Sequence, residues 1–200
     1  MNQVKKIGIM GGTFDPIHYG HLVTAEAARY RYGLDRVYFV PAYIPPHKQF
    51  KTVTPADHRL MMTTMATVNN PAFVVSDIEI QRGGLSYTYD TVRAFKKELG
   101  GDIEVYFITG ADAIIELTQW MKIEELVKEC HFIGATRPGY HLNAKLPDYL
   151  LASVSFMEVP ALAISSTDIR KRVAKGAPIH YLLPETVEMY IRKNRLYIEE

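Results

Sequence analysis

The stretch that decides the fold reads Lys6-Ile7-Gly8-Ile9-Met10-Gly11-Gly12-Thr13-Phe14-Asp15-Pro16-Ile17-His18-Tyr19-Gly20-His21. Its apolar beginning, Lys6–Met10, predicts a strand that breaks at the glycine pair. Helix-forming residues over Leu22–Tyr32 predict a helix directly after it. A strand, a glycine loop and a helix in this order begin a βαβ unit.

The same alternation continues along the chain. We expect further strands at Arg36–Val40, Phe73–Ile80, Glu104–Ile108, Phe132–Ala135 and Ser153–Val159. We expect further helices at Pro55–Val68, Thr88–Leu99, Ala113–Leu117, Ile123–Val127, Ser166–Ala174 and Glu185–Lys193. Short strands that alternate with helices predict an α/β fold, a Rossmann-like doubly wound, mostly parallel sheet with helices on both faces. Ligands of such sheets bind beyond the carboxyl ends of the strands.

Composition narrows the class of protein. With 200 residues, of which 48% are hydrophobic, the chain can bury one core, so we expect a single domain over residues 1–200. The formal charge of +1 gives no field that would attract nucleic acid or a membrane surface. The single cysteine, Cys130, excludes an internal disulfide and fits a cytoplasmic protein. No apolar stretch approaches the roughly 20 residues that span a bilayer.

The segment from Gly11 to His21 is suited to bind phosphate. Gly11 and Gly12 let the backbone approach a ligand, and the helix start offers N–H groups and a partial positive charge. His18 and His21 are three residues apart, so both can donate to one phosphate group. A tight turn with two surface histidines and a zinc pair are the alternatives. The segment lacks the lysine of a Walker loop and the third glycine of a dinucleotide fingerprint.

A second segment, Ile164–Arg170, also follows a predicted strand and starts a helix. Ser165 and Asp168 have capping-box spacing, and capping alone would explain the serines. The hydroxyls of this segment and the guanidinium of Arg170 could also hold terminal phosphates. Two phosphate-binding helix starts are what a triphosphate requires, provided that the sheet brings them together.

These two segments resemble the signatures of the nucleotidyltransferase superfamily, His-x-Gly-His at His18–His21 and Ile-Ser-Ser-Thr-x-Ile-Arg at Ile164–Arg170. Within it, the chain resembles the bacterial nicotinate-nucleotide adenylyltransferases of NAD biosynthesis over essentially its whole length. Further segments that resemble this family are Ile44–Lys48, Ser86–Thr91, Thr109–Asp112, Trp120 and Arg137–Gly139. The resemblance implies in-line attack of the phosphate of nicotinate mononucleotide on the α-phosphorus of ATP, which gives nicotinate adenine dinucleotide (deamido-NAD) and pyrophosphate.

The resemblance also implies roles for single residues. His18, His21 and Arg170 would be catalytic. The residues expected to bind ATP are Gly11, Gly12, Thr13, Phe14, Gly110, Asp112, Ile164, Ser165, Ser166 and Thr167. The expected cofactor is Mg²⁺, held mainly by the ATP phosphates rather than by a protein metal site.

The acceptor side rests on fewer residues. Backbone N–H groups at a helix start, around Tyr87, Thr88 and Tyr89, could receive the nicotinate carboxylate, and Trp120 could stack on the pyridine ring. Lys48 and Arg137 are further candidates. A core role for Trp120 and a solvated Lys48 are the alternatives, and we expect surface or packing roles for His47 and His58.

Several alternative functions are compatible with some of these sequence features. The acceptor could be nicotinamide mononucleotide or phosphopantetheine, although a neutral amide would gain less than an acid at a positive helix end. A nucleotide sensor without turnover is the alternative outside enzymes, and a nucleic-acid adaptor lacks a basic stripe. We therefore expect ATP and nicotinate mononucleotide as partners, no nucleic acid and no membrane, with self-association into a homo-oligomer left open.

Overall fold

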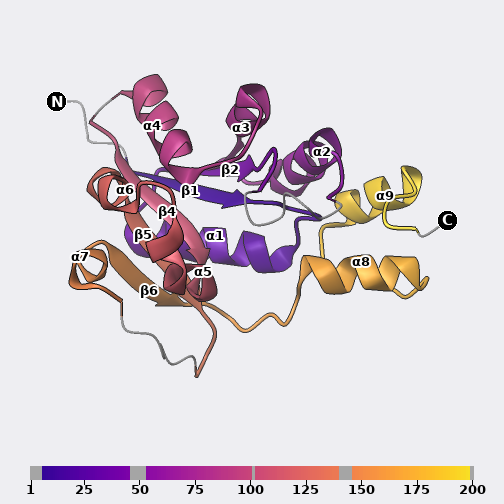
Figure 1. Cartoon of the computed structure of the whole chain (residues 1–200). Helices are drawn as coiled ribbons and strands as arrows, with labels where there is room; N and C mark the ends of the chain where they lie inside the picture. The colour runs from indigo at the N-terminus through magenta and orange to yellow at the C-terminus, as the bar shows by residue number, and fades with distance from the viewer. Residues whose placement is uncertain (1–5, 46–52, 101, 140–145, 199–200) are drawn as a thin grey trace.

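A six-stranded sheet forms the centre of the computed structural model, which describes residues 6–45, 53–100, 102–139 and 146–198 (Figure 1). The strands are β1 (Lys6–Gly12), β2 (Arg36–Pro41), β3 (Phe73–Val75), β4 (Glu104–Gly110), β5 (His131–Thr136) and β6 (Val154–Glu158). They lie in the order β3-β2-β1-β4-β5-β6, and each pairing is parallel. The predicted Rossmann-like α/β class is confirmed, with a sheet that is parallel throughout.

The strand order reverses between β1 and β4. From β1 the chain continues to β2 and β3 on one side of the sheet, and then returns to build β4, β5 and β6 on the other side. In open α/β sheets the ligand crevice lies at this reversal, outside the carboxyl ends of the strands. The ends concerned are Gly12 of β1 and Gly110 of β4.

Side chains of the strands alternate between two hydrophobic clusters, as a pleated sheet requires. In β1, Ile7 and Ile9 face one cluster and Met10 faces the other. The cluster that contains Met10 is covered by α1 (Tyr19–Tyr32), α2 (Ala56–Thr67), α8 (Ser166–Ala174) and α9 (Glu185–Lys193). The other is covered by α4 (Thr88–Leu99), α5 (Ala111–Ile115), α6 (Ile123–Glu129) and α7 (Asp148–Leu151). Helices therefore pack on both faces of the sheet.

Two parts of the local prediction need correction. The segment Phe73–Ile80 was expected to be a strand, but β3 ends at Val75 and α3 (Ile78–Arg82) follows it. The alternation in Ile78-Glu79-Ile80 suggested a strand, yet Glu79 is buried and accepts a hydrogen bond from Thr91 Oγ1 of α4 at 2.5 Å. The expected helix Ala113–Leu117 begins earlier, as α5, and is followed by the 3₁₀ turn η2 (Leu117–Gln119). Helix α7 was not predicted.

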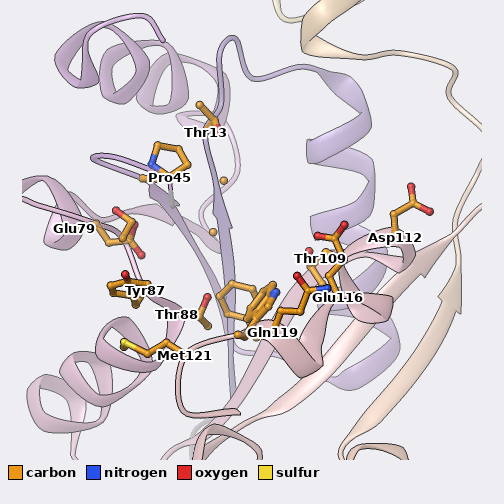
Figure 2. A pocket seen from close by; sticks show the side chains of 17 residues that line it. Thr13, Pro45, Glu79, Tyr87, Thr88, Thr109, Asp112, Glu116, Gln119 and Met121 are labelled. Atoms are coloured by element: carbon orange, nitrogen blue, oxygen red, sulfur yellow. The ribbon is translucent and has the colours of Figure 1, made fainter. Parts of the chain in front are cut away.

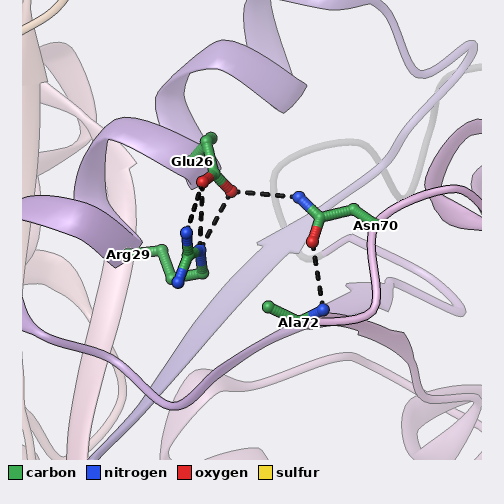
Figure 3. A network of polar contacts seen from close by, with 4 residues as sticks. All are labelled: Glu26, Arg29, Asn70 and Ala72. Atoms are coloured by element: carbon green, nitrogen blue, oxygen red, sulfur yellow. Dashed lines mark hydrogen bonds and ion pairs between the residues drawn. The ribbon is translucent and has the colours of Figure 1, made fainter.

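A polar network fixes α1 against the segment that leads into β3 (Figure 3). Glu26 accepts hydrogen bonds from Arg29 Nη2 at 2.6 Å and from Asn70 Nδ2 at 3.0 Å. The other end of the Asn70 amide accepts from the Ala72 N–H at 3.0 Å. The hydrogen bond from Arg29 holds the pKa of the Glu26 carboxyl below its usual value. This network links the middle of α1 to the segment before β3.

Within the described ranges, no helix is both long enough and apolar enough to cross a membrane.

Candidate active site

The loop between β1 and α1 is shaped by close packing. A Cβ atom on Gly12 would lie 3.0 Å from the ring of Phe14, so a larger residue would displace that ring. Phe14 has a φ of 50°, in the left-handed region that non-glycine residues seldom adopt. Its side chain is 2% exposed and packs edge-on against His21 with ring centroids 5.1 Å apart. Phe14, expected to bind ATP, thus has its side chain in the core and supports a histidine.

The two histidines form one stacked unit. His18 is the N-cap of α1, and its ring lies over the ring of His21 with centroids 3.8 Å apart. The His18 backbone N–H donates to His21 Nδ1 at 3.2 Å. Because that nitrogen accepts, a neutral His21 carries its proton on Nε2 and can donate from there. A Cβ on Gly20 would lie 3.0 Å from the His18 ring, so glycine leaves room for this arrangement.

Burial sets the charge of His18. The residue is 7% exposed, and burial lowers the pKa of its imidazole to about 4. Its Nδ1 atom is buried and has no hydrogen-bond partner among the described residues. At neutral pH the ring is therefore uncharged in this structure.

Two cavities lie at the crevice predicted by the strand order, and the histidines line one of them. The first has a volume of about 570 Å³ and the second about 530 Å³. Both are lined by Gly11, Thr109 and Asp112, so they meet at the carboxyl ends of β1 and β4. A ligand in one cavity would therefore lie next to a ligand in the other.

The second cavity contains the histidines. Its other lining residues come from the first turns of α1, the end of β4 and the segments after β5 and β6; they include Gly20, Thr24, Gly110, Thr136, Arg137, Leu162 and Ile164. Arg137, expected on the acceptor side, lines this cavity and not the first one, because it follows β5 on the far side of β4.

The first cavity lies between the start of α4 and the segment after α5. Figure 2 shows Glu79, Tyr87 and Thr88 on one side, with Glu116 and Asp112 on the other. Trp120 also lines it, and the indole packs edge-on against Phe107 and Phe132, with ring centroids 5.7 Å and 6.0 Å away. Trp120 is thus both part of the core and part of the cavity wall, so the two expected roles are compatible.

Helix α4 directs its amino end at the first cavity. Its N-cap residue, Tyr87, makes no side-chain cap to the first turn, and Thr88 opens the helix. The Tyr89 side chain turns away and donates to Glu125 Oε2 at 2.7 Å, which leaves only its backbone for the role we expected.

The second signature segment packs onto the loop of the first. Ser165 caps α8 by accepting from the Asp168 N–H at 3.1 Å, as predicted. Ser166 Oγ donates to the Pro16 carbonyl at 2.8 Å, and Arg170 Nη1 donates to the Asp15 carbonyl at 2.6 Å. Figure 1 shows α8 beyond the carboxyl end of β1, as this contact requires. The sheet thus brings the two segments together. Thr167 accepts a long 3.4 Å bond from Arg170 Nη2.

The remaining expectations concern two histidines and a lysine. Lys48 and His47 lie outside the described residues. His58 Nδ1 is 2.9 Å from the hydroxyl of Tyr190, which agrees with a packing role.

Sequence reasoning missed three polar residues around the site. Arg59 is 1% exposed and donates to the carbonyls of Thr13, Tyr43 and Thr54, and its burial lowers the pKa of the guanidinium. Its helical spacing with Met62 and Ala66 on the buried face of α2 could have revealed it. Glu79 lines the first cavity, and burial raises the pKa of its carboxyl. The third, Tyr197, binds Asp15 and had no sequence signal.

Comparison with known proteins defines the class. A family model described as "Cytidylyltransferase-like" matches residues 9–172, and the chain belongs to this family of nucleotidyltransferases. The "Probable nicotinate-nucleotide adenylyltransferase" of Moorella thermoacetica is 57% identical over 96% of this chain and 91% of its own length. The protein of the same name from Thermoanaerobacter sp. is 54% identical over 98% and 96%. Within the larger family, this chain belongs to the nicotinate-nucleotide adenylyltransferases, nucleotidyltransferases of NAD biosynthesis.

A solved structure agrees with this assignment. It is the "Plasmodium falciparum nicotinic acid mononucleotide adenylyltransferase complexed with NaAD", with a TM-score of 0.76 and 27% sequence identity. The match covers 96% of this chain and 97% of that one.

Proposed function

We propose that this chain transfers the adenylyl group of ATP to nicotinate mononucleotide, with pyrophosphate as the second product. One observation carries the proposal: the two cavities meet at Gly11, Thr109 and Asp112. The stacked histidines line the second cavity, and Trp120 lines the first. Two nucleotides bound there would have their phosphates at a common boundary. The names of the relatives support the identity of both substrates.

ATP would occupy the second cavity. His21 can donate from Nε2, and a neutral His18 adds a second ring nitrogen toward the same region. Their fixed stacking suits them to the charge that develops on the α-phosphate, since preorganised donors stabilise a transition state without reorganisation. Arg170 would bind the terminal phosphates, because only part of its guanidinium is used by Asp15 and Thr167. Gly110 and Asp112 would meet the ribose.

Nicotinate mononucleotide would occupy the first cavity. The amino end of α4 at Thr88 carries a partial positive charge that favours a carboxylate over a neutral amide. The exposed face of Trp120 would stack on the pyridine ring. Glu79 and Glu116 also line this cavity, so charge alone does not attract the acceptor, and the helix end has to provide local selectivity.

The reaction needs positioning and neutralisation of charge. An oxygen of the acceptor phosphate forms a bond to the α-phosphorus, and the bond from that phosphorus to the oxygen bridging to the β-phosphate breaks, which releases pyrophosphate. No covalent enzyme intermediate is required. Among the described residues, no three His, Cys, Asp or Glu side chains group as a metal site, so Mg²⁺ would take most of its ligands from ATP and water. When bound, Mg²⁺ would neutralise charge on the triphosphate.

The test is pyrophosphate release from ATP and Mg²⁺ with three separate acceptors. We expect strong preference for nicotinate mononucleotide over nicotinamide mononucleotide and phosphopantetheine. Release only with another acceptor would keep the class of reaction and contradict the proposed first cavity. ATP binding without release with any acceptor would favour the sensor.

A further inference from the structure

The loop from Thr13 to Pro16 is held from outside by side chains distant in sequence. Three of its carbonyl oxygens accept bonds: Thr13 from Arg59 Nη1 at 2.8 Å, Asp15 from Arg170 Nη1 at 2.6 Å, and Pro16 from Ser166 Oγ at 2.8 Å. These bonds use acceptors of the loop and none of its N–H groups, so they do not compete with a phosphate for those donors.

A fourth restraint comes from the end of the chain. The hydroxyl of Tyr197, beyond α9, donates to Asp15 Oδ1 at 2.9 Å. The carboxylate is 5% exposed, and its other oxygen accepts from the Thr54 N–H at 3.4 Å. Burial, together with the neighbouring carboxylate of Asp15, raises the pKa of Tyr197, so the hydroxyl keeps the proton that it donates.

The loop requires such restraints because its backbone is strained. The left-handed φ of Phe14 persists only where the surroundings fix it. Asp15 follows Phe14 directly and lies three residues before His18, the N-cap of α1. A shift of Asp15 would therefore move the start of α1 and the stacked histidines.

We propose that Tyr197 is a positioning residue for adenylyl transfer, which acts through Asp15 to hold the loop and the His18–His21 pair in register with the substrate phosphates. The expected effect on kcat rests on the proposed function, but the restraint that Tyr197 places on the loop can be measured without turnover. A displacement of about 1 Å at a reacting group can lower a rate roughly a hundredfold.

The experiment compares Tyr197→Phe with Tyr190→Phe in the full chain. Each variant loses one tyrosine hydroxyl. That of Tyr197 donates to Asp15 and makes a longer 3.9 Å bond to Met62 Sδ, whereas that of Tyr190 bonds to His58, outside both cavities. We expect similar small decreases in Tm for both. We expect kcat to fall about tenfold or more only in Tyr197→Phe, with KM for both substrates changing much less. Equal kcat values in the two variants would overturn the proposal.

Hydrogen–deuterium exchange tests the role of Tyr197 independently of the proposed reaction. Peptides that cover residues 11–21 should exchange faster in Tyr197→Phe than in the wild type or in Tyr190→Phe, even if no acceptor supports turnover. Unchanged exchange there would overturn the proposal. If Tyr197 acts through Asp15, adding Tyr197→Phe to Asp15→Ala, which removes the acceptor, should lower kcat no further, and a further full decrease would also overturn it.

Discussion

Arg170 Nη1 donates to the carbonyl oxygen of Asp15 at 2.6 Å, although 155 residues separate them in sequence. The bond joins the helix of one signature segment to the loop of the other. Since Asp15 precedes His18 in the same loop, the position of Arg170 and that of the histidines are coupled. The remaining guanidinium donors can still bind a phosphate, which a lysine in this place could not match.

We expect Arg170→Lys to lower kcat/KM for ATP by roughly tenfold to a hundredfold, the range expected for losing one hydrogen bond to a charged group. The matched control is Arg172→Lys on the same helix, because Arg172 pairs with Asp168 on the exposed surface. That change should alter kcat/KM by less than about twofold. Steady-state kinetics at varied ATP concentration provide the measurement, and equal effects in the two variants would remove Arg170 from the site.

His21→Ala should lower kcat roughly a hundredfold or more, since a preorganised donor to the transition state is lost. ATP affinity should change much less, because under the proposed function ground-state binding would also use the loop and Arg170. His131→Asn is the control: His131 starts β5, at the opposite end of the strand from the crevice. Single-turnover rates and ATP titrations distinguish the two effects, and an equal loss of rate and affinity would assign His21 to ground-state binding instead.

Trp120→Leu should raise KM for nicotinate mononucleotide by roughly tenfold, the range that loss of ring stacking gives, and leave KM for ATP nearly unchanged. Leucine keeps apolar contact with Phe107, so the fold should persist. Phe132→Leu is the matched control, because it removes an aromatic ring from the same cluster without touching the cavity. If both variants raise the acceptor KM equally, Trp120 acts only through packing.

The sequence indicates two segments that the structure brings together, and their signals are local. The strand, the glycine pair and the helix start of residues 6–21 occur in one continuous stretch, as do Ser165 and its cap. What it missed depends on tertiary contact. Arg59 and Tyr197 bind backbone or carboxylate oxygens of a distant loop. The helical spacing of Arg59 with Met62 and Ala66 indicates only that Arg59 is buried, and no motif identifies the partner of either residue.

Arg137 illustrates a second limit. The loop that carries Arg137 follows a strand, and all strands of a parallel sheet end at the same edge. The position of Arg137 in the sequence therefore does not show which of the two adjacent cavities it lines. The strand order decides this, since β5 lies beyond β4 from β1. Glu79 shows a different limit. The alternation around it is typical of a strand, but the segment forms a short helix in which the carboxyl is buried.

Asn70→Ala should lower the free energy of unfolding by about 1–2 kcal/mol, because the Ala72 N–H and Glu26 each lose a partner. Activity at 25 °C should stay within about twofold, because no residue of this network lines either cavity. Urea unfolding with parallel activity assays tests both. A large loss of kcat at full folding would mean that the orientation of α1 depends on this network.

The buried His18 makes stability depend on pH in a defined direction. Its pKa is about 4 in the folded chain against 6.5 for an unperturbed histidine, so the unfolded state binds more protons between these values. The contribution is fully present above pH 6.5 and is lost as pH falls toward 4, with a limit of about 3 kcal/mol. His18→Asn removes the titrating group and should flatten the unfolding free energy between pH 7 and 4.5 relative to the wild type. Because carboxylates titrate equally in both proteins, the difference between the two curves isolates His18, and parallel curves would show that its pKa is the same in the folded and the unfolded chain.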